Sequence, residues 1–335
     1  MREEFMEESG YIKINNYSRH HGGVDKYLEN IFGNSFREYR TRWHQLTKRE
    51  ILTDFPNYVV VETLFNCNYS CKMCHKSVEE LRNALSYTDV MSMDMYKHII
   101  DECSEHNCPS VCCTGNYEPL VDRLMVERLK YASEKGILDV IIKTNGSLLS
   151  EEIADAFIEN GLTRLSISLD AASEETYSKI RSKDYKKVVE NTERFLSLRD
   201  KKKAKLPVLR LSYCVTSIND FEQESFLNLW KDKADEISFQ RFTPPENREN
   251  FKHLYPEARE SMNFFCSQPF ERVVIRGDGN VYPCCYQTMK IPVGNMKENS
   301  LYDIWNGDKI NEYRRIVVEE QWDANPCCLE CSQAR

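Results

Sequence analysis

Between Tyr58 and Phe242, short apolar runs alternate along the chain with longer segments of helical patterning. The apolar runs are rich in Val, Ile, Leu and Cys and do not alternate strictly with polar residues, which is typical of parallel strands covered by helices. The expected strands are 58–64, 110–115, 139–146, 164–170, 208–216 and 236–242. The expected helices lie near 92–106, 121–135, 150–160, 173–198 and 221–233. This order predicts an α/β fold, a partial (β/α)6 barrel of parallel strands, although a doubly wound open sheet fits the same pattern.

The rest of the chain flanks this barrel on both sides. Residues 1–54 predict an N-terminal helical extension, residues 55–245 the barrel, and residues 246–335 a linker followed by a small cysteine-rich domain. A chain of 335 residues is long enough for such a barrel with residues to spare. The last domain is too small and too rich in cysteine to be stable by apolar burial alone, so we expect a metal cluster to hold it together.

Charge and composition exclude several classes of function. The net charge is −8, whereas a nucleic-acid-binding protein presents a basic face to phosphate. No apolar stretch reaches the length of a membrane span, and the acidic N-terminus has no apolar signal segment. We therefore expect a cytoplasmic protein without a nucleic-acid or membrane partner. In a reducing compartment, its 14 cysteines are better explained as metal ligands, thiols or core residues than as disulfides.

Three cysteines follow the first expected strand at a fixed spacing. Cys67, Cys71 and Cys74 lie in the stretch CNYSCKMC, and cysteine counting gives such a triplet a chance probability of roughly 0.02. A loop that leaves the carboxyl end of a barrel strand faces the side where barrel chemistry takes place.

The number of cysteines in the triplet indicates the kind of metal centre. A structural zinc ion takes four protein ligands, whereas an iron–sulfur cubane takes one thiolate for each iron. Three thiolates leave one iron open to an external ligand. A Cys₃His zinc site that uses His75 is the alternative, but His75 directly follows Cys74 and is poorly placed to chelate beside it.

CNYSCKMC resembles the signature of the radical S-adenosylmethionine (SAM) superfamily. The resemblance implies a [4Fe–4S] cluster whose open iron is chelated by the amino and carboxylate groups of SAM. In that family, reduction of the cluster cleaves SAM to methionine and a 5′-deoxyadenosyl radical, which abstracts a hydrogen atom from the substrate. An external one-electron reductant of the flavodoxin or ferredoxin type is implied as a partner.

Further segments resemble the family's motifs in the same order along the chain. TGNYEPL (114–120) is similar to its Gly-Gly-Glu-Pro segment, although Tyr117 stands where a second glycine is common. KTNG (143–146) and SISLDA (166–171) resemble its later motifs. The residue before the third cysteine is Met73, where the family usually has an aromatic side chain against the adenine, and methionine can fill that space. The resemblance therefore implies cofactor contacts at Met73, Gly115, Glu118, Asn145, Ser168 and Asp170.

The C-terminal region contains a second group of cysteines. A hairpin with Asp278-Gly279 at its turn precedes a cysteine pair, and a Cys-x-x-Cys pair closes the chain. This region resembles the SPASM/twitch extension of radical SAM enzymes, in a shortened form. The resemblance implies a second, auxiliary [4Fe–4S] cluster on four cysteines, namely Cys266, Cys284, Cys328 and Cys331. Cys285 and Cys327 are alternatives to their neighbours, and a Zn(Cys)₄ site is the alternative to a cluster.

Three further residues are candidates for reaction with the substrate. Cys214 lies near the end of the fifth strand outside both cysteine groups, where its thiol is a candidate hydrogen-atom donor; a small buried hydrophobe is the competing interpretation. Gln240 and Arg241 end the last strand and are candidate substrate contacts, since arginine can hold a carboxylate or phosphate.

The sequence therefore predicts a radical SAM oxidoreductase or epimerase. The expected substrate is polar, a sugar derivative or another small metabolite, and the expected outcome is dehydrogenation or epimerisation. A ribosomal-peptide-modifying radical SAM enzyme is the first alternative. An iron–sulfur electron carrier or a zinc-stapled binding module is the alternative from another class.

Overall fold

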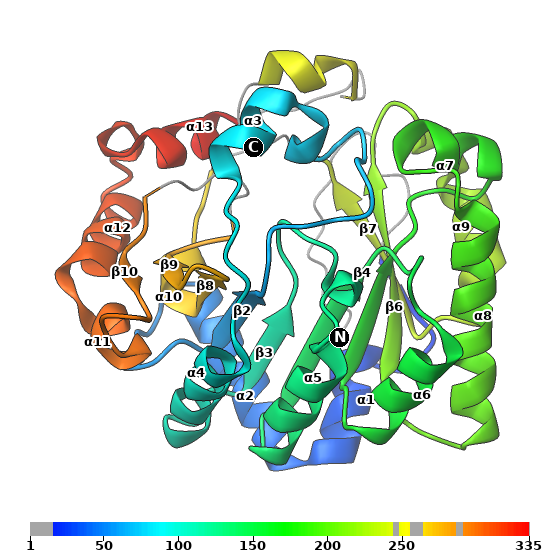
Figure 1. The fold of residues 1–335 in the computed structure, drawn as a ribbon, viewed down its shortest axis with the longest axis horizontal. Helices are drawn as coiled ribbons and strands as arrows, with labels where there is room; N and C mark the ends of the chain where they lie inside the picture. Colours follow the sequence, from blue (N-terminus) through cyan, green and yellow to red (C-terminus); the bar gives the residue numbers. More distant parts are fainter. Residues whose placement is uncertain (1–15, 244–247, 255–263, 286–290, 335) are drawn as a thin grey trace.

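The structure is a computed structural model that describes residues 16–243, 248–254, 264–285 and 291–334. Six parallel strands form its centre, and each one pairs with the next along the chain. They are β2 (Tyr58–Glu62), β3 (Ser110–Cys113), β4 (Asp139–Thr144), β5 (Arg164–Ser168), β6 (Val208–Val215) and β7 (Glu236–Arg241). A doubly wound sheet reverses its strand order at a switch point, and this sheet does not. The predicted partial barrel is therefore confirmed (Figure 1).

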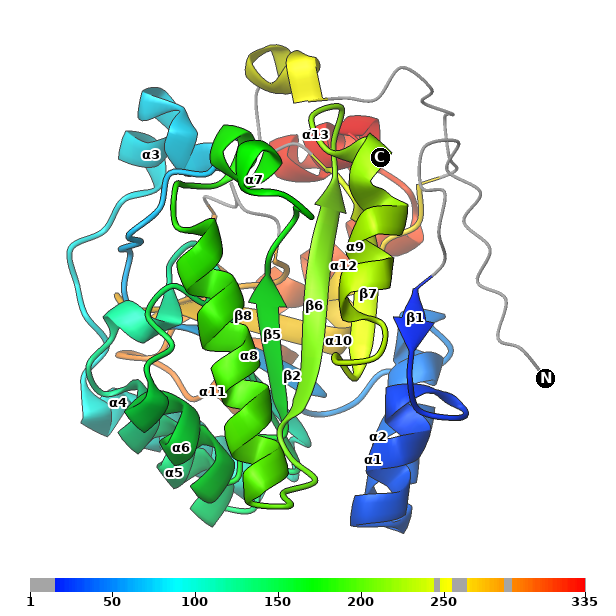
Figure 2. The same ribbon diagram turned by 90° about the vertical axis from the view of Figure 1, so that its right-hand side faces the viewer.

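Helices follow the strands as predicted and run along the outside of the curved sheet (Figures 1 and 2). They are α4 (Met93–Glu105), α5 (Met125–Glu134), α6 (Glu151–Glu159), α7 (Glu174–Ile180), α8 (Tyr185–Lys201) and α9 (Gln223–Trp230). Ser92 and Ser150 cap α4 and α6 by accepting hydrogen bonds from backbone N–H groups of the first turn. The single helix expected over 173–198 is wrong, because the chain breaks after Ile180 and two helices form.

The N-terminal extension closes the amino ends of the strands. It contains β1 (Tyr17–Ser18), α1 (Gly23–Phe32) and α2 (Asn34–Thr47), with Gly33 between the two helices at a φ of 72°. Such a positive φ suits glycine because there is no Cβ to clash. β1 pairs antiparallel with β7, and an apolar cluster that includes Leu28 and Phe36 packs the helices against the barrel at Val208.

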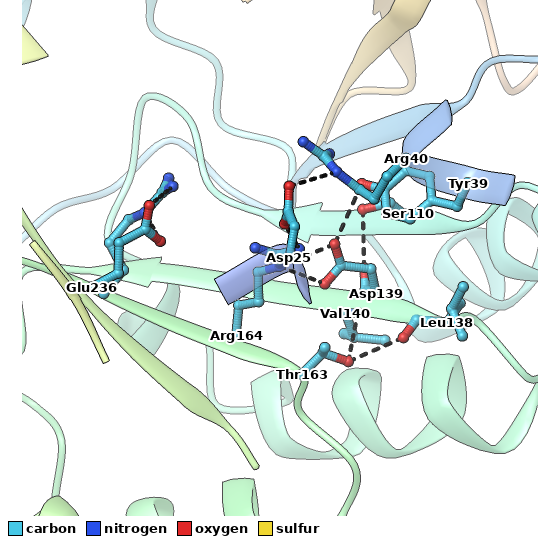
Figure 3. Close-up of polar contacts among 11 residues, drawn as sticks. Asp25, Tyr39, Arg40, Ser110, Leu138, Asp139, Val140, Thr163, Arg164 and Glu236 are labelled. Atoms are coloured by element: carbon cyan, nitrogen blue, oxygen red, sulfur yellow. Dashed lines mark hydrogen bonds and ion pairs between the residues drawn. The ribbon is translucent and has the colours of Figure 1, made fainter. Parts of the chain in front are cut away.

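A network of charged side chains, of which Asp139 is buried and the others are partly exposed, joins this extension to the barrel (Figure 3). The Arg164 guanidinium on β5 lies 3.0 Å from Asp139 on β4 and 2.9 Å from Asp25 on α1. Arg40 on α2 also pairs with Asp25, at 2.8 Å, and Tyr39 donates to Asp139. Burial alone would raise the pKa of Asp25, but the charges of Arg164 and Arg40 outweigh it and lower this pKa below its usual value.

The C-terminal region continues the barrel sheet. β8 (Arg272–Arg276) pairs in parallel with β2, and β9 (Asn280–Tyr282) and β10 (Gly294–Asn295) extend the sheet antiparallel. The predicted hairpin turn lies between β8 and β9, where Gly279 has a φ of 88°. The helices of this region are α10 (Gln268–Glu271), α11 (Leu301–Asn306), α12 (Asp308–Val318) and α13 (Pro326–Ala334). The auxiliary region is therefore attached to the open edge of the barrel.

The remaining elements are short. α3 (Glu79–Leu85) follows the cysteine triplet, and 3₁₀ turns lie at His75–Ser77, Pro119–Val121, Asp220–Glu222, Arg248–Leu254 and Trp322–Ala324. The expected linker begins at residue 246, and residues 246–247 and 255–263 of this segment lie outside the described residues. No helix in the described ranges has the length and apolar character needed to cross a membrane.

Replacing Arg164 by methionine should destabilise the protein by about 3 kcal/mol, because it leaves the Asp139 carboxylate buried without its cationic partner. Urea unfolding of the purified protein measures the change. The control is Lys179→Met, which removes an exposed pair with Glu175 and should change the free energy of unfolding by less than about 0.5 kcal/mol. Equal effects of the two substitutions would show that the charged network does not hold the extension.

Candidate functional site

The three cysteines of the triplet lie on the loop that leaves β2, at the carboxyl ends of the barrel strands. All three are half-buried. The loop is fastened to the end of α7 by a hydrogen bond from the Lys72 N–H to the Ile180 carbonyl, at 2.9 Å. The Cys74 N–H donates to the Cys71 carbonyl, and the Tyr69 N–H lies 3.4 Å from Cys67 Sγ. The loop is therefore held on both sides of the middle cysteine.

The three thiols are close enough to interact electrostatically. Burial raises the pKa of Cys71 to about 12, and Cys74 and Cys67 add to this shift. Nowhere in the described part of the chain do three or more Cys, His, Asp or Glu side chains surround a point that one metal ion would occupy. A cubane has different requirements, because each thiolate binds a different iron and the sulfurs surround a group of atoms. A set of three thiolates therefore matches three of the four irons of a cubane.

Arg181 links the middle cysteine to the predicted cofactor residue Asp170. Its Nη1 lies 3.8 Å from Cys71 Sγ, and its Nε donates to the Asp170 carboxylate. The same carboxylate accepts a hydrogen bond from the Cys214 N–H at 2.6 Å, and Asp170 has a φ of 57°. Asp170 therefore positions both Arg181 and the end of β6. Sequence reasoning missed Arg181, because a single arginine at the end of a helix carries no motif.

Glu118 joins the loop after β3 to the end of β4. Its side chain is buried, and its Oε1 accepts from Thr144 Oγ1 at 2.5 Å and from the Leu120 N–H at 3.1 Å. Its Oε2 accepts from the Asn145 N–H at 2.7 Å. Burial raises the pKa of Glu118, and these donors oppose the rise. The chain itself therefore donates three hydrogen bonds to the Glu118 carboxylate, which the family resemblance implies as a cofactor contact.

Asn145 connects this pair of loops to the cysteine loop. Its Nδ2 donates to Asn68 Oδ1 at 2.9 Å, and Asn68 directly follows Cys67. Asn145 Oδ1 accepts from the N–H and the hydroxyl of Ser147. The three motifs from separate strands are therefore brought together at one edge by direct hydrogen bonds.

Glu62, the last residue of β2, lies against the Gly115 segment. A Cβ on Gly115 would stand 2.1 Å from Glu62 Oε1, and its φ is 138°, so glycine is required there. Glu62 Oε1 accepts from the N–H and the side chain of Asn116, and its Oε2 lies 3.6 Å from Arg276 Nε. Burial raises the pKa of Glu62. This glutamate was also missed, although an acidic residue at the end of an otherwise apolar strand was a signal for it.

Met73 and Cys214 pack against one apolar cluster at the same edge. The cluster contains Leu81, Phe242, Phe251 and Leu254. Burial and the nearby Asp170 carboxylate raise the pKa of Cys214, which keeps its sulfur in the thiol form. 

The other predicted residues lie along the strand ends. Ser168 is half-buried at the end of β5. Gln240 is exposed and pairs with Cys214 across β6 and β7, whereas Arg241 is half-buried.

The C-terminal cysteines gather around the start of α13. Burial raises the pKa of Cys328 to about 12, with smaller contributions from Cys266, Cys331 and Cys327, so these sulfurs lie close together. Cys284 and Cys328 both act electrostatically on Tyr313. Cys285, in contrast, is exposed and donates to Gln268 Oε1 at 3.2 Å. The geometry thus favours Cys284 over its neighbour as a ligand.

Asn325 positions this cysteine group. Its Oδ1 accepts from the N–H groups of Cys327 and Cys328, and its Nδ2 donates to the Tyr313 hydroxyl. Cys327 is buried in the main core. 

The barrel, the cysteine triplet at its carboxyl edge and the attached cysteine-rich region define a radical SAM domain followed by an iron–sulfur domain. Residues 61–210 match the radical SAM superfamily, and residues 266–332 match the SPASM iron–sulfur cluster-binding domain. The chain belongs to the radical SAM superfamily. Membership makes SAM and a [4Fe–4S] cluster its cofactors, and the SPASM domain adds auxiliary iron–sulfur binding.

Curated relatives are enzymes of this superfamily. The AdoMet-dependent heme synthase of Methanosarcina barkeri (strain Fusaro / DSM 804) is 32% identical over 130 residues, which are 39% of this chain and 36% of that enzyme. The GTP 3′,8-cyclase of Alkaliphilus oremlandii (strain OhILAs) is 26% identical over 276 residues, which are 71% of this chain and 83% of the cyclase. The heme synthase match thus spans about a third of that protein.

Solved structures share the fold. BtrN in complex with AdoMet and 2-DOIA aligns with a TM-score of 0.55 and 20% identity over 83% of this chain and 93% of BtrN. Native anSMEcpe with bound AdoMet aligns with a TM-score of 0.59 and 18% identity over 82% of this chain and 88% of that chain. At these identities the likeness concerns the fold alone.

The positions of Cys284 and Cys285 lead to a test by iron content. In a background with Cys67, Cys71 and Cys74 all changed to alanine, Cys284→Ala should remove the auxiliary cluster, about four irons per chain. Cys285→Ala is the matched control and should keep this iron, because its thiol faces Gln268. Iron and sulfide analysis after anaerobic reconstitution measures both. Loss of iron from the Cys285 variant alone would reverse the ligand assignment.

Proposed function

We propose that this chain reductively cleaves SAM at the triplet cluster and uses the resulting radical to abstract a hydrogen atom from a polar small molecule. Dehydrogenation or epimerisation of a sugar derivative or a related metabolite is the proposed outcome. The observation that carries this proposal is the hydrogen-bonded edge that joins Cys67, Asn68, Asn145 and Glu118. An electron carrier or a zinc-stapled module needs metal-binding cysteines, but it binds no SAM and therefore does not require these hydrogen-bonded residues beside the cysteine loop.

When bound, the cluster would supply the electron and an open iron for SAM. The chain's own residues then hold that cofactor in place. Cys67, Cys71 and Cys74 are the proposed cluster ligands, and Arg181 places a positive charge 3.8 Å from Cys71 Sγ. The proposed neighbours of SAM are Gly115, Glu118, Asn145, Ser168 and Asp170, and Met73 provides an apolar surface for its adenine. Glu118 and Thr144 fix the backbone on which these residues lie.

Cys214 is the proposed hydrogen-atom donor to the substrate radical. A donor of this kind must carry its hydrogen on sulfur, and the raised pKa of Cys214 favours that form. Its thiol lies in the apolar cluster with Met73, next to the proposed adenine site. If the substrate radical is oxidised instead, the auxiliary cluster on Cys266, Cys284, Cys328 and Cys331 is the proposed electron acceptor. An external flavodoxin- or ferredoxin-type protein is the proposed source of the first electron.

Cys71→Ala should abolish SAM cleavage, because it removes the central ligand of the proposed cluster. Deoxyadenosine formed during anaerobic incubation with SAM and dithionite measures the loss. Cys285→Ala is the control and should retain wild-type cleavage, since its exposed thiol lies outside both ligand sets. Wild-type levels of deoxyadenosine from the Cys71 variant would refute the ligand assignment, and no deoxyadenosine from the wild-type protein would refute the proposed function.

Cys214→Ala should uncouple hydrogen abstraction from the final quench. Deoxyadenosine should still form with substrate, whereas transfer of solvent deuterium into the product should fall to background, because the exchangeable S–H is gone. Mass spectrometry of the product made in deuterated water measures the transfer. Unchanged deuterium incorporation in the Cys214 variant would reject this thiol as the donor.

A further inference from the structure

A polar pocket of about 470 Å³ lies at the amino end of the barrel, between the strands and the N-terminal extension. Its volume falls in the range of small-molecule sites, roughly 300–1,000 Å³. A closed (β/α)8 barrel fills its interior with layers of Val, Ile and Leu, whereas this barrel has six parallel strands and is open. Here the lining includes five cationic and three carboxylate side chains, namely Arg40, Lys143, Arg164, Arg210, Arg272, Asp25, Asp139 and Glu236.

One row of paired residues crosses the wall of this pocket from β4 to β7. Lys143 pairs with Ser166, Ser166 with Arg210, and Arg210 with Glu236 in the strand register. All four line the pocket. Because side chains two apart share a face of a strand, the next row above consists of Ser168, Ser212 and Ser238.

The row above the serines contains Cys214 and Gln240, so the pocket lies directly beneath the proposed reaction site. At about 3.3 Å per residue, the row of Lys143 is about 7 Å below the serines and about 13 Å below Cys214. The inward side chains of β5, β6 and β7 between these levels are serines, which are small and polar. A small molecule that reaches from the pocket to the proposed site would not meet a bulky side chain from these strands.

Lys143 differs from the other cations in having no partner. Arg164 and Arg40 pair with carboxylates of the network in Figure 3, and Arg210 holds Glu236 through two contacts of 2.8 and 2.6 Å. Arg272 pairs with Glu271 at 2.7 Å. Within the described ranges, the Lys143 ammonium makes no hydrogen bond or ion pair, although it projects from the interior face of β4 into the pocket. The Lys143 side chain is exposed, so its ammonium is open to an anionic ligand that enters the pocket, and a charged donor binds such a ligand more strongly than a neutral donor does.

We propose that Lys143 binds an anionic group of the substrate, a carboxylate or a phosphate. The neighbouring Ser166 hydroxyl, which shares a hydrogen bond of 3.1 Å with the Ser212 hydroxyl, can donate to the same group when Ser212 is the donor of that pair. This inference rests on the proposed function and narrows its substrate class to small anionic molecules. The anionic group binds at the level of Lys143, and the rest of the molecule extends past the serines toward Cys214. Arg210 is less suited to this role, because Glu236 already occupies its guanidinium.

Calorimetric titration of the reconstituted protein with SAM present tests the proposal. The probes are inorganic phosphate, succinate and the neutral succinamide. We expect phosphate or succinate to bind and succinamide not to bind. Lys143→Met should weaken the binding at least tenfold, which corresponds to about 1.4 kcal/mol. Lys143→Arg should retain most of it, since the charge is kept.

Lys187→Met on the exposed face of α8 is the matched control and should bind the probes like wild type. If Lys143→Met does not fold, Lys143→Gln removes the charge with a smaller change in polarity and takes its place. Failure of both anions to bind, or equal affinity with and without the charge at position 143, would overturn the inference. The phosphate and succinate arms decide which anionic group the site prefers.

The same preparations separate this inference from the proposed function. Deoxyadenosine formation by the wild-type protein tests SAM cleavage without any probe. If SAM is cleaved but the anions bind the wild-type protein and the Lys143 variants equally well, the anionic-substrate inference alone is overturned. Lys143-dependent anion binding without any cleavage would overturn the proposed function and leave an anion site in the barrel.

Discussion

The carboxylate of Glu118 is the interaction on which the geometry of the site depends. A buried carboxylate is costly unless it is well supplied with donors, and Glu118 receives three from two separate loops. This requirement fixes the turn after β3 relative to the end of β4. Asn145 then lies where its amide reaches Asn68 beside Cys67. The position of one proposed cluster ligand thus depends on a carboxylate 51 residues away in the sequence.

Two further buried carboxylates act in the same way along the edge. Asp170 holds Arg181 beside Cys71 and accepts from the backbone of Cys214. Glu62 accepts from Asn116 and occupies the space that a side chain at Gly115 would need. Glu118 and Asp170 are satisfied by the protein's own donors, so these contacts hold the edge together without a group from outside the chain. Such preorganisation lets a site hold a reactive group in one geometry.

The repeating strands and helices of the barrel could be predicted from the sequence. The features that depend on contacts between residues far apart in the sequence could not. All six strands and most helices were predictable because apolar runs and helix caps are local signals. The split of 173–198 into α7 and α8 was not, because the chain turns where Arg181 contacts Asp170 and Cys71. The parallel pairing of β8 with β2 joins residues more than 200 positions apart and has no local signal. The cysteine triplet was recognisable by its spacing, whereas Arg181 and Glu62 are defined only by their neighbours in space.

The charged interior of the barrel suggests why this chain needs its N-terminal helices. The buried Asp139 carboxylate would be costly without a cationic partner. Arg164 is that partner, and α1 and α2 contribute the Asp25 carboxylate and the Tyr39 hydroxyl that complete the network. Because this network pairs the charges at the amino end of the barrel, the next row of inward side chains can be polar. It consists of Lys143, Ser166, Arg210 and Glu236, where a filled barrel would place branched apolar side chains. An apolar core at this level would be more stable in isolation, so the polar lining is better explained by a ligand than by folding. Lys143, whose ammonium makes no hydrogen bond or ion pair with the described residues, then sets the sign of the charge that such a ligand carries.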